Sequence, residues 1–142
     1  MAALTHARLD TTSRRGKHVR ARLKKELVIW LATVGRDGKP HAVPVWFQWD
    51  GDTFLVYSLP GQKVLDVKGN PSVVLHLNAG DEGEDVVRID GVAKVDPKHA
   101  PAYKVPPYVR KYRRLIKEYK WTPKSFSEQY HVVISIRPTR YH

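Results

Sequence analysis

The sequence predicts a mainly β protein: a small antiparallel β-barrel of six strands with helical additions. Six runs rich in β-branched and aromatic residues follow one another, with turn residues between several of them. A basic amphipathic segment precedes the last run and predicts a helix outside the barrel. Because 42% of the 142 residues are hydrophobic, residues 1–142 can bury a core, and we expect them to form a single domain.

Each predicted strand is a short run bounded by turn residues. Asp37-Gly38 and Asp50-Gly51-Asp52 are hairpin signals that separate the first three runs. An acidic, glycine-containing segment separates the fourth run from the fifth, and Gly91 inside the fifth predicts a bulge or the close approach of another backbone. The six predicted strands cover residues 28–34, 41–49, 53–59, 72–78, 86–95 and 132–136.

The second predicted strand carries apolar side chains on both faces. Alternation puts Val43, Val45, Phe47 and Trp49 on one face, and Ala42, Pro44, Trp46 and Gln48 on the other. One face therefore predicts a core, and the other a partner or a ligand. Pro44 lies in the middle of this strand, although proline cannot donate to a ladder and is confined to sheet edges, bulges or places where something else occupies the backbone.

Helices are predicted where apolar residues recur at helical spacing. The clearest has Tyr108, Tyr112, Leu115, Ile116 and Tyr119 on one side and Arg110, Arg113, Arg114 and Lys117 on the other. Thr122 predicts the N-cap of the next helix, with Pro123 as its first residue. The predicted helices cover residues 14–26, 62–70, 107–120 and 123–130.

The charge of the chain points to an anionic partner. There are 25 Lys and Arg residues against 14 Asp and Glu residues, which gives a formal net charge of +11 and a pI near 10.0. Such a surface attracts nucleic acid, acidic lipid or a phosphorylated cofactor, and the alternative is an ordinary solvated face.

Several function classes lack their sequence signals. The absence of cysteine excludes disulfides, thiolate zinc sites and cysteine nucleophiles, and it favours an intracellular setting. The seven histidines show no metal-binding spacing, so we expect no metal site. There is no nucleophile elbow, Walker loop or Gly-x-Gly-x-x-Gly. An enzyme with this sequence would take its chemistry from a cofactor, and we nominate no catalytic side chain.

The sequence also predicts the setting of the protein. The N-terminal segment lacks the apolar core of a signal peptide, and no apolar run approaches the ~18 residues that a membrane span needs. We therefore expect a cytoplasmic protein without a membrane partner.

The junction after the third predicted strand is the best candidate site. Ser58 ends the strand, Gly61 makes a turn, and Gln62 and Lys63 open a helix whose first N–H groups are free. A phosphate suits such a place. The alternative is an ordinary polar junction between a strand and a helix.

Several ordered motifs resemble a known family. The order "T-V-x-x-D-G-x-P-x-x-x-P-V-W-F-x-W-D-G-D-x-F-L-V-Y-S", then "P-G-x-K-x-x-x-x-x-x-N-P", then "D-x-V-x-x-x-G-x-A" resembles the split-barrel flavin and deazaflavin oxidoreductases, the pyridoxamine-phosphate-oxidase-like proteins. "Y-V-R-K-Y", "W-T-P-K-S-F" and "I-R-P-T-R" are similar to the branch that uses coenzyme F-420, a deazaflavin.

The resemblance implies a homodimer of six-stranded split barrels, with cofactor sites in the groove between the two chains. It implies that coenzyme F-420 passes a hydride to an unsaturated small-molecule substrate. By position, Val43, Pro44 and Val45 would lie along the tricyclic ring, Tyr57 and Ser58 near the ribityl chain, and Gly61, Gln62 and Lys63 at the phosphate.

Three functions stay open at this stage. The first is the F-420-dependent reductase. The second, in the same fold, is an FMN-binding oxidase or reductase. The third is a non-enzymatic barrel that binds single-stranded nucleic acid by charge and aromatic stacking. We favour the first, and with it no nucleic-acid partner. Trp46, Trp49 and Tyr57 are candidate walls of a substrate pocket or plain core residues.

Overall fold

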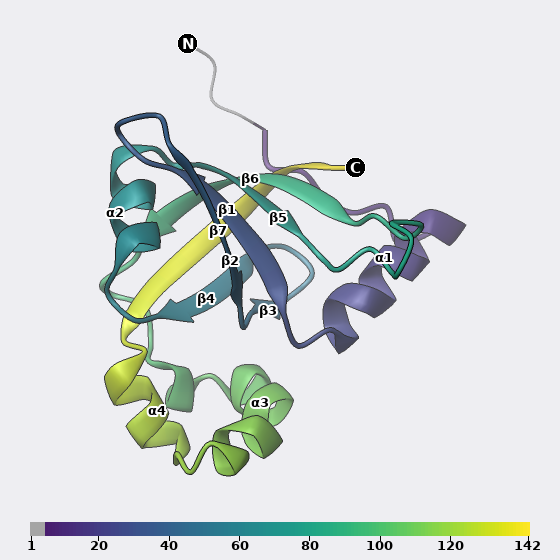
Figure 1. Cartoon of the computed structure of the whole chain (residues 1–142). Coiled ribbons are helices and arrows are strands. Elements are labelled where there is room, and N and C mark those ends of the chain that lie inside the picture. Colours follow the sequence, from purple (N-terminus) through teal and green to yellow (C-terminus); the bar gives the residue numbers. More distant parts are fainter. Residues whose placement is uncertain (1–4) are drawn as a thin grey trace.

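An antiparallel sheet curls into a half-barrel, with two helices packed below it and one at each side (Figure 1). The structure is a computed structural model and describes residues 5–142. The strands are β1 (Ile29–Val34), β2 (Pro40–Val45), β3 (Gln48–Trp49), β4 (Phe54–Ser58), β5 (Ser72–His76), β6 (Arg88–Val95) and β7 (Val132–Tyr141). The α-helices are α1 (Arg14–Lys25), α2 (Gln62–Gly69), α3 (Pro106–Glu118) and α4 (Pro123–Gln129), and a 3-10 turn, η1, covers Ala102–Lys104.

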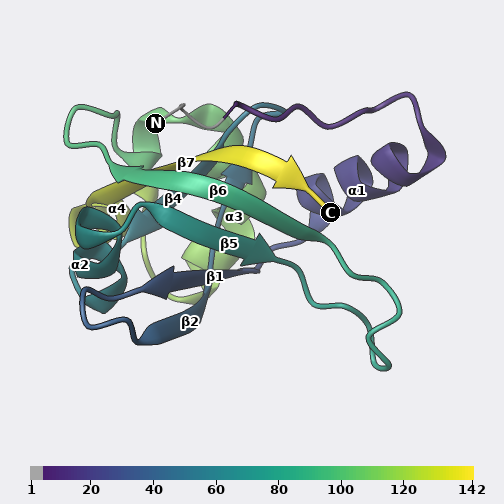
Figure 2. The same cartoon turned by 90° about the horizontal axis from the view of Figure 1, so that it is seen from above.

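The strand order is β2-β1-β5-β6-β7-β4-β3, and every neighbouring pair is antiparallel. Figure 2 shows β7, β6, β5, β1 and β2 side by side. The described residues form seven strands, so the prediction of six was wrong. The predicted strand 41–49 is two strands, because β2 pairs with β1 at one edge of the sheet and β3 pairs with β4 at the other.

The backbone between β2 and β3 is held by helix α3 and not by a neighbouring strand. The Phe47 amide donates to the Tyr112 hydroxyl over 2.7 Å, and the Lys111 ammonium donates to the Phe47 carbonyl over 2.9 Å. These groups replace ladder partners at the point where the chain crosses between the two edges. The tertiary contact with α3 therefore explains why the predicted strand is interrupted.

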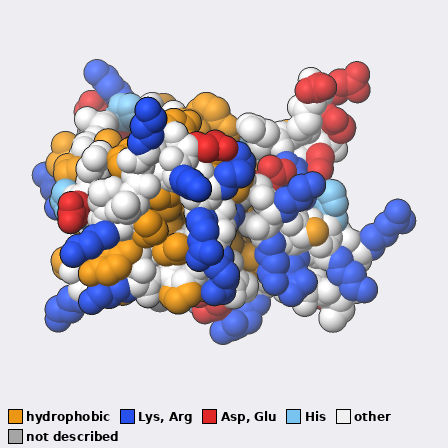
Figure 3. Space-filling view, turned by 90° about the horizontal axis from the view of Figure 1, so that it is seen from below, with side chains coloured by type: hydrophobic (Ala, Val, Ile, Leu, Met, Phe, Trp, Pro, Cys, Tyr) orange, Lys and Arg blue, Asp and Glu red, His pale blue; other side chains and the backbone are white. Residues whose placement is uncertain are grey.

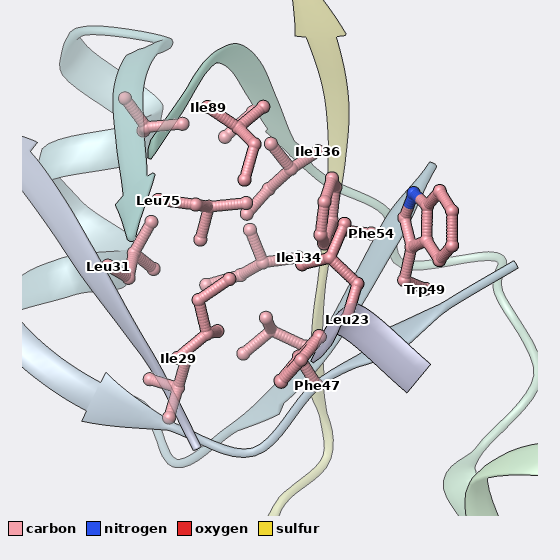
Figure 4. Packing of buried hydrophobic residues seen from close by; sticks show 14 of the residues in the cluster. Leu23, Ile29, Leu31, Phe47, Trp49, Phe54, Leu75, Ile89, Ile134 and Ile136 are labelled. Carbon is pink, nitrogen blue, oxygen red and sulfur yellow. The ribbon is translucent and has the colours of Figure 1, made fainter. Parts of the chain in front are cut away.

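The main core fills the inside of the curled sheet. Figure 4 shows Leu31 of β1, Leu75 of β5, Ile89 of β6 and Ile134 and Ile136 of β7 pointing toward one another, with Leu23 of α1 closing one end. The predicted alternation in residues 41–49 is confirmed, since Val45, Phe47 and Trp49 belong to this core. Trp49 is only 3% exposed and belongs to the core, the plainer of the two predicted alternatives.

Gly91 allows β6 and β7 to come close together. The register of the pair shifts between Asp90 and Gly91, and a Cβ added at Gly91 would lie 2.8 Å from the Ile136 side chain. The predicted bulge or close approach is confirmed.

A second, aromatic cluster lies below the sheet, where η1, α3 and α4 gather. Tyr108, Tyr112 and Ile116 are its buried α3 residues, as the periodicity predicted, whereas Tyr119 is 63% exposed. The Thr122 N-cap is confirmed, because its side chain accepts from the Ser125 amide in a capping box. No helix in the part of the chain that the structure describes is long and apolar enough to cross a bilayer.

Candidate functional site

A pocket of about 370 Å³ opens where the end of β2 meets the turn between β4 and α2 and the two helices below the sheet. The strands and the turn contribute Pro44, Val45, Trp46, Tyr57, Ser58 and Leu59. The helices and their connections contribute Lys63, Tyr119, Trp121, Phe126 and Tyr130. Lys63 is the one charged residue among these lining side chains.

One wall of the pocket is a set of nearly parallel aromatic rings. Trp46 stacks on Phe126 at 5.6 Å between centroids and 14° between planes, and Phe126 stacks on Tyr130 at 4.7 Å and 10°. Behind Trp46, Tyr112 stacks at 4.6 Å and 3°. Trp121 meets Phe126 edge-on. Such a wall favours a flat conjugated ligand, because aromatic rings gain from offset stacking beyond their buried area.

Most of this wall was not predicted from the sequence. Tyr119, Trp121, Phe126 and Tyr130 lie within twelve residues of one another along the chain. That density of aromatic residues after the basic helix was the available signal. Helical periodicity alone predicts core for such residues, so the signal does not reveal which rings face a cavity.

Pro44 lies on an edge strand, in one of the places that a proline tolerates. It faces Trp30 across the β1–β2 pair, and β2 has no other neighbour in the sheet. Pro44 is exposed and lines the pocket, and Val45 contributes to the pocket from the next position. Val43 instead packs against the main core.

The other end of the pocket is polar. The buried Ser58 hydroxyl donates to the Leu59 carbonyl over 2.6 Å. Gly61 gives α2 no side-chain cap, so the Gln62 and Lys63 amides stay free within the described residues, whereas the Val64 amide donates to the Gly61 carbonyl. Burial lowers the pKa of Lys63 from its ordinary value. A half-buried ammonium and free amide groups together attract an anion.

Two residues assigned to the phosphate by resemblance do not line this pocket. Gly61 lies at an adjoining apolar hollow with Leu65 and Val133. Gln62 lines a third hollow beside Gly35, and its side-chain amide donates to Asp66 over 2.8 Å. The pocket therefore brings together Pro44, Val45, Tyr57, Ser58 and Lys63 from the predicted set, and not Val43, Gly61 or Gln62.

Tyr57 lines the pocket, but it lacks the lowered pKa that would let its hydroxyl act as a proton donor. Its hydroxyl donates to the Ala100 carbonyl over 2.7 Å, and burial raises the pKa of the phenol well above its ordinary value. Within residues 5–142 there is also no group of three His, Asp or Glu side chains that could hold a metal ion. The chemistry that this arrangement supports is binding of a flat, anionic molecule.

Comparison with known proteins decides the family. The profile of the pyridoxamine 5'-phosphate oxidase family matches residues 16–142. The chain belongs to this family. The predicted resemblance is confirmed at that level, and the F-420 branch is represented by one of the similar structures below. No curated protein matches this sequence.

Three solved structures illustrate the likeness. A protein from Listeria innocua, provisionally assigned as a pyridoxamine 5'-phosphate oxidase, is 25% identical with a TM-score of 0.66, covering 89% of this chain and 94% of that one. An F-420 reductase is 25% identical with a TM-score of 0.63, covering 87% and 94%. A heme storage protein from Vibrio cholerae is 13% identical with a TM-score of 0.62, covering 94% and 92%, and it shares the fold alone.

Proposed function

We propose that this protein is an oxidoreductase that binds coenzyme F-420 and transfers a hydride to an unsaturated small-molecule substrate. The observation that carries the proposal is the pocket in which an aromatic wall, an exposed edge proline and a lysine at an uncapped helix start meet. Membership of the family and the 25% identity to an F-420 reductase support a flavin-type cofactor.

The residues of the pocket fit such a cofactor. Pro44, Val45 and Trp46 offer apolar surface to a flat ring, and Lys63 with the first amides of α2 offers charge to a phosphate. A bound deazaflavin would supply the hydride. The protein would orient the ring, exclude water with its aromatic wall and hold the anionic group, while solvent supplies any proton.

The second part of the proposal is a homodimer. The outward face of β2, β1 and β5 carries two rows of residues that face one another in register: Pro44, Trp30 and His76, and Ala42, Ala32 and Val74. These side chains are exposed or half-buried, and Trp30 stacks on His76 at 6.1 Å. A second copy of the chain would cover this apolar face, which continues to Pro44 at the pocket.

Light scattering tests the dimer. We expect a dimer at micromolar concentration, and Trp30→Glu, which places a charge in the middle of the face, to produce a monomer. A monomeric wild-type protein whose mass does not change with added cofactor would contradict this part of the proposal.

The charge distribution favours the deazaflavin over FMN. Figure 3 shows many Lys and Arg side chains over the face with α3 and α4, and acidic side chains mainly at one corner. Coenzyme F-420 carries a polyglutamate tail, whereas FMN ends at its phosphate. A basic surface beside the pocket would hold and steer the longer anion.

A titration of the apoprotein with both cofactors tests the function. F-420 should bind more tightly than FMN at low salt, and the difference should shrink as salt screens exposed charges over a Debye length of about 10 Å at 0.1 M. The bound species is identified by spectroscopy, since FMN gives a two-band flavin spectrum and a deazaflavin a single violet-blue band with bright fluorescence. Tighter FMN binding at low salt, or a preference that salt does not change, would favour the FMN-dependent alternative.

The family match favours that alternative, an FMN-binding oxidase or reductase, as the second candidate. Both cofactors present a tricyclic ring and a phosphate to the same pocket. The nucleic-acid reading predicts a different outcome: steeply salt-dependent binding of oligonucleotides without binding of either cofactor.

A further inference from the structure

A buried carboxylate joins helix α2 to the hairpin formed by β1 and β2. Asp66 is 1% exposed, and its two oxygens are engaged by three side chains. The Thr33 hydroxyl donates to Oδ2 over 2.7 Å, and His41 Nδ1 lies 2.7 Å from the same oxygen. The Gln62 side-chain amide donates to Oδ1 over 2.8 Å.

The proposed function does not use this cluster, although burying a charged carboxylate costs free energy. Burial by itself would raise the pKa of Asp66, but the hydrogen bonds from Gln62, Thr33 and His41 bring it below its ordinary value. The carboxylate is therefore ionised at neutral pH. A buried charge persists in a fold only when its partners compensate for lost hydration, so removing a partner has a large effect.

Two glycines let the hairpin turn approach α2 closely. A Cβ at Gly35 would lie 3.2 Å from an Asp66 carboxylate oxygen. A Cβ at Gly69 would lie 2.8 Å from the Arg36 side chain, at the end of the helix. The turn after β1 therefore contacts both the middle and the end of α2.

Helix α2 depends on such contacts for its orientation. It has eight residues, a length at which an isolated helix is unstable in water. Val64 and Val67 bury one side against the main core, and Asp66 fixes the helix from the side of the hairpin. Lys63 lines the pocket and follows Gln62 in the first turn of the helix, three residues before Asp66, a spacing that makes the two positions neighbours on the helix surface.

We infer that Asp66 is a positioning residue, which holds the first turn of α2 so that Lys63 and the free amides face an anionic phosphate in the pocket. Gln62 acts through Asp66 and does not touch the phosphate. This inference rests on the proposed function and names the group that organises its phosphate end.

The first test compares ligands with and without the phosphate. FMN and riboflavin differ only in the phosphate and form the deciding pair, whereas F-420 and its phosphate-free chromophore differ in the polyglutamate tail as well and form the supporting pair. In Asp66→Asn, the new amide N–H₂ faces hydrogen-bond donors, so the cluster breaks without a change in side-chain size. We expect affinity for the phosphate-bearing ligand to fall about tenfold, while affinity for the phosphate-free ligand stays the same.

The matched control is Val67→Ala, which loosens the packing of the same helix without touching the carboxylate. It should lower the free energy of unfolding but leave the first turn of α2 bound to Asp66, so the ratio of the two affinities in each pair should stay as in the wild type. An equal loss of both ligands in Asp66→Asn, or no loss of the phosphate-bearing one, would overturn the inference.

The second test uses the apoprotein and does not depend on a cofactor. Gln62→Ala and Lys68→Ala both shorten exposed side chains of α2 to a good helix former, but only the first removes a contact to Asp66. Hydrogen exchange of the bonded amides of α2 should speed up in Gln62→Ala and not in Lys68→Ala. Equal exchange rates in both variants would contradict a positioning role.

The two failures are distinguishable. A wild-type protein that binds neither FMN nor F-420 would contradict the proposed function. The exchange measurement would then decide whether Asp66 still organises α2.

Discussion

The two hydrophobic clusters of this protein differ in composition and in closure. The cluster inside the sheet is mostly aliphatic, and its centre is closed to solvent, with Leu31, Leu75 and Ile134 fully buried. The cluster below the sheet is mostly aromatic, and Trp46, Trp121 and Tyr130 at its margin are only partly buried. The first contributes only Val45 to the pocket, whereas the second supplies most of the pocket wall.

This difference predicts that the first cluster mainly determines stability and that the second mainly determines ligand binding. Closed aliphatic packing resists change because a lost methylene leaves a cavity. An aromatic cluster with one open side can add a further flat ring at little cost, because its rings already lie nearly parallel. We therefore expect substitutions in the first cluster to change unfolding and substitutions around the second to change ligand binding.

The largest effect should come from Ile134→Ala in the closed cluster. Ile134 has no exposed surface, so its truncation should lower the free energy of unfolding by about 2–5 kcal/mol. Urea denaturation measures this loss, and the affinity of the folded variant for cofactor should stay unchanged. A loss of affinity at temperatures where the variant is folded would show that the two clusters are coupled.

The next largest effect should come from Lys63→Ala at the open side. A charge-assisted contact with phosphate is worth about 1.5–3 kcal/mol, so cofactor binding should weaken by roughly ten- to a hundredfold. Lys117→Ala and Lys24→Ala remove exposed charges elsewhere and should have much smaller effects. Equal losses in all three variants would argue for diffuse attraction without a defined phosphate site.

Lys111 lies at the boundary between the clusters, and it should make the free energy of unfolding depend on pH. It lies 3.6 Å above the Phe47 ring, and burial lowers its pKa to about 8, against a partly opposing effect of Glu26. Between pH 8 and about 10.5 the unfolded chain binds more protons at this lysine, so its contribution to stability rises with pH across that window.

Lys111→Met isolates this contribution from the other titrating groups. The difference in unfolding free energy between wild type and Lys111→Met should change by about 1–2 kcal/mol from pH 8 to pH 10.5 in favour of the wild type. Chemical denaturation at several pH values measures it, with Lys117→Met as the exposed control. A difference that stays constant with pH would mean that Lys111 keeps its ordinary pKa.

The smallest effect should come from Tyr108→Phe in the aromatic cluster, in contrast to Tyr112→Phe in the same cluster. The buried Tyr108 hydroxyl has no hydrogen-bond partner within the described chain, so Tyr108→Phe should leave stability unchanged or raise it by up to about 1 kcal/mol. Tyr112→Phe should lower it by about 1–3 kcal/mol, because the hydroxyl accepts from the Phe47 amide and donates to the Leu27 carbonyl. Thermal denaturation of the two variants gives the comparison, and a loss of stability in Tyr108→Phe would show a contact that compensates its burial.

Local sequence patterns determined most of the secondary structure. The Asp37-Gly38 and Asp50-Gly51-Asp52 turns, the alternation in residues 41–49 and the Thr122 N-cap each depend on neighbours within a few positions. Such signals act through local backbone preferences, so they can be read without knowledge of the fold. The family motifs added the position of the turn from Ser58 to Lys63.

Only the tertiary structure decided how the predicted elements divide into separate strands and combine to form the pocket. The break between β2 and β3 depends on Tyr112 and Lys111, which lie more than sixty residues farther along the chain. The pocket joins strand residues to an aromatic wall from α3 and α4, and the side chain of Gln62 turns away from it toward a carboxylate held by Thr33. Contacts of this kind form between residues distant in sequence, whose pairing leaves no trace in local periodicity.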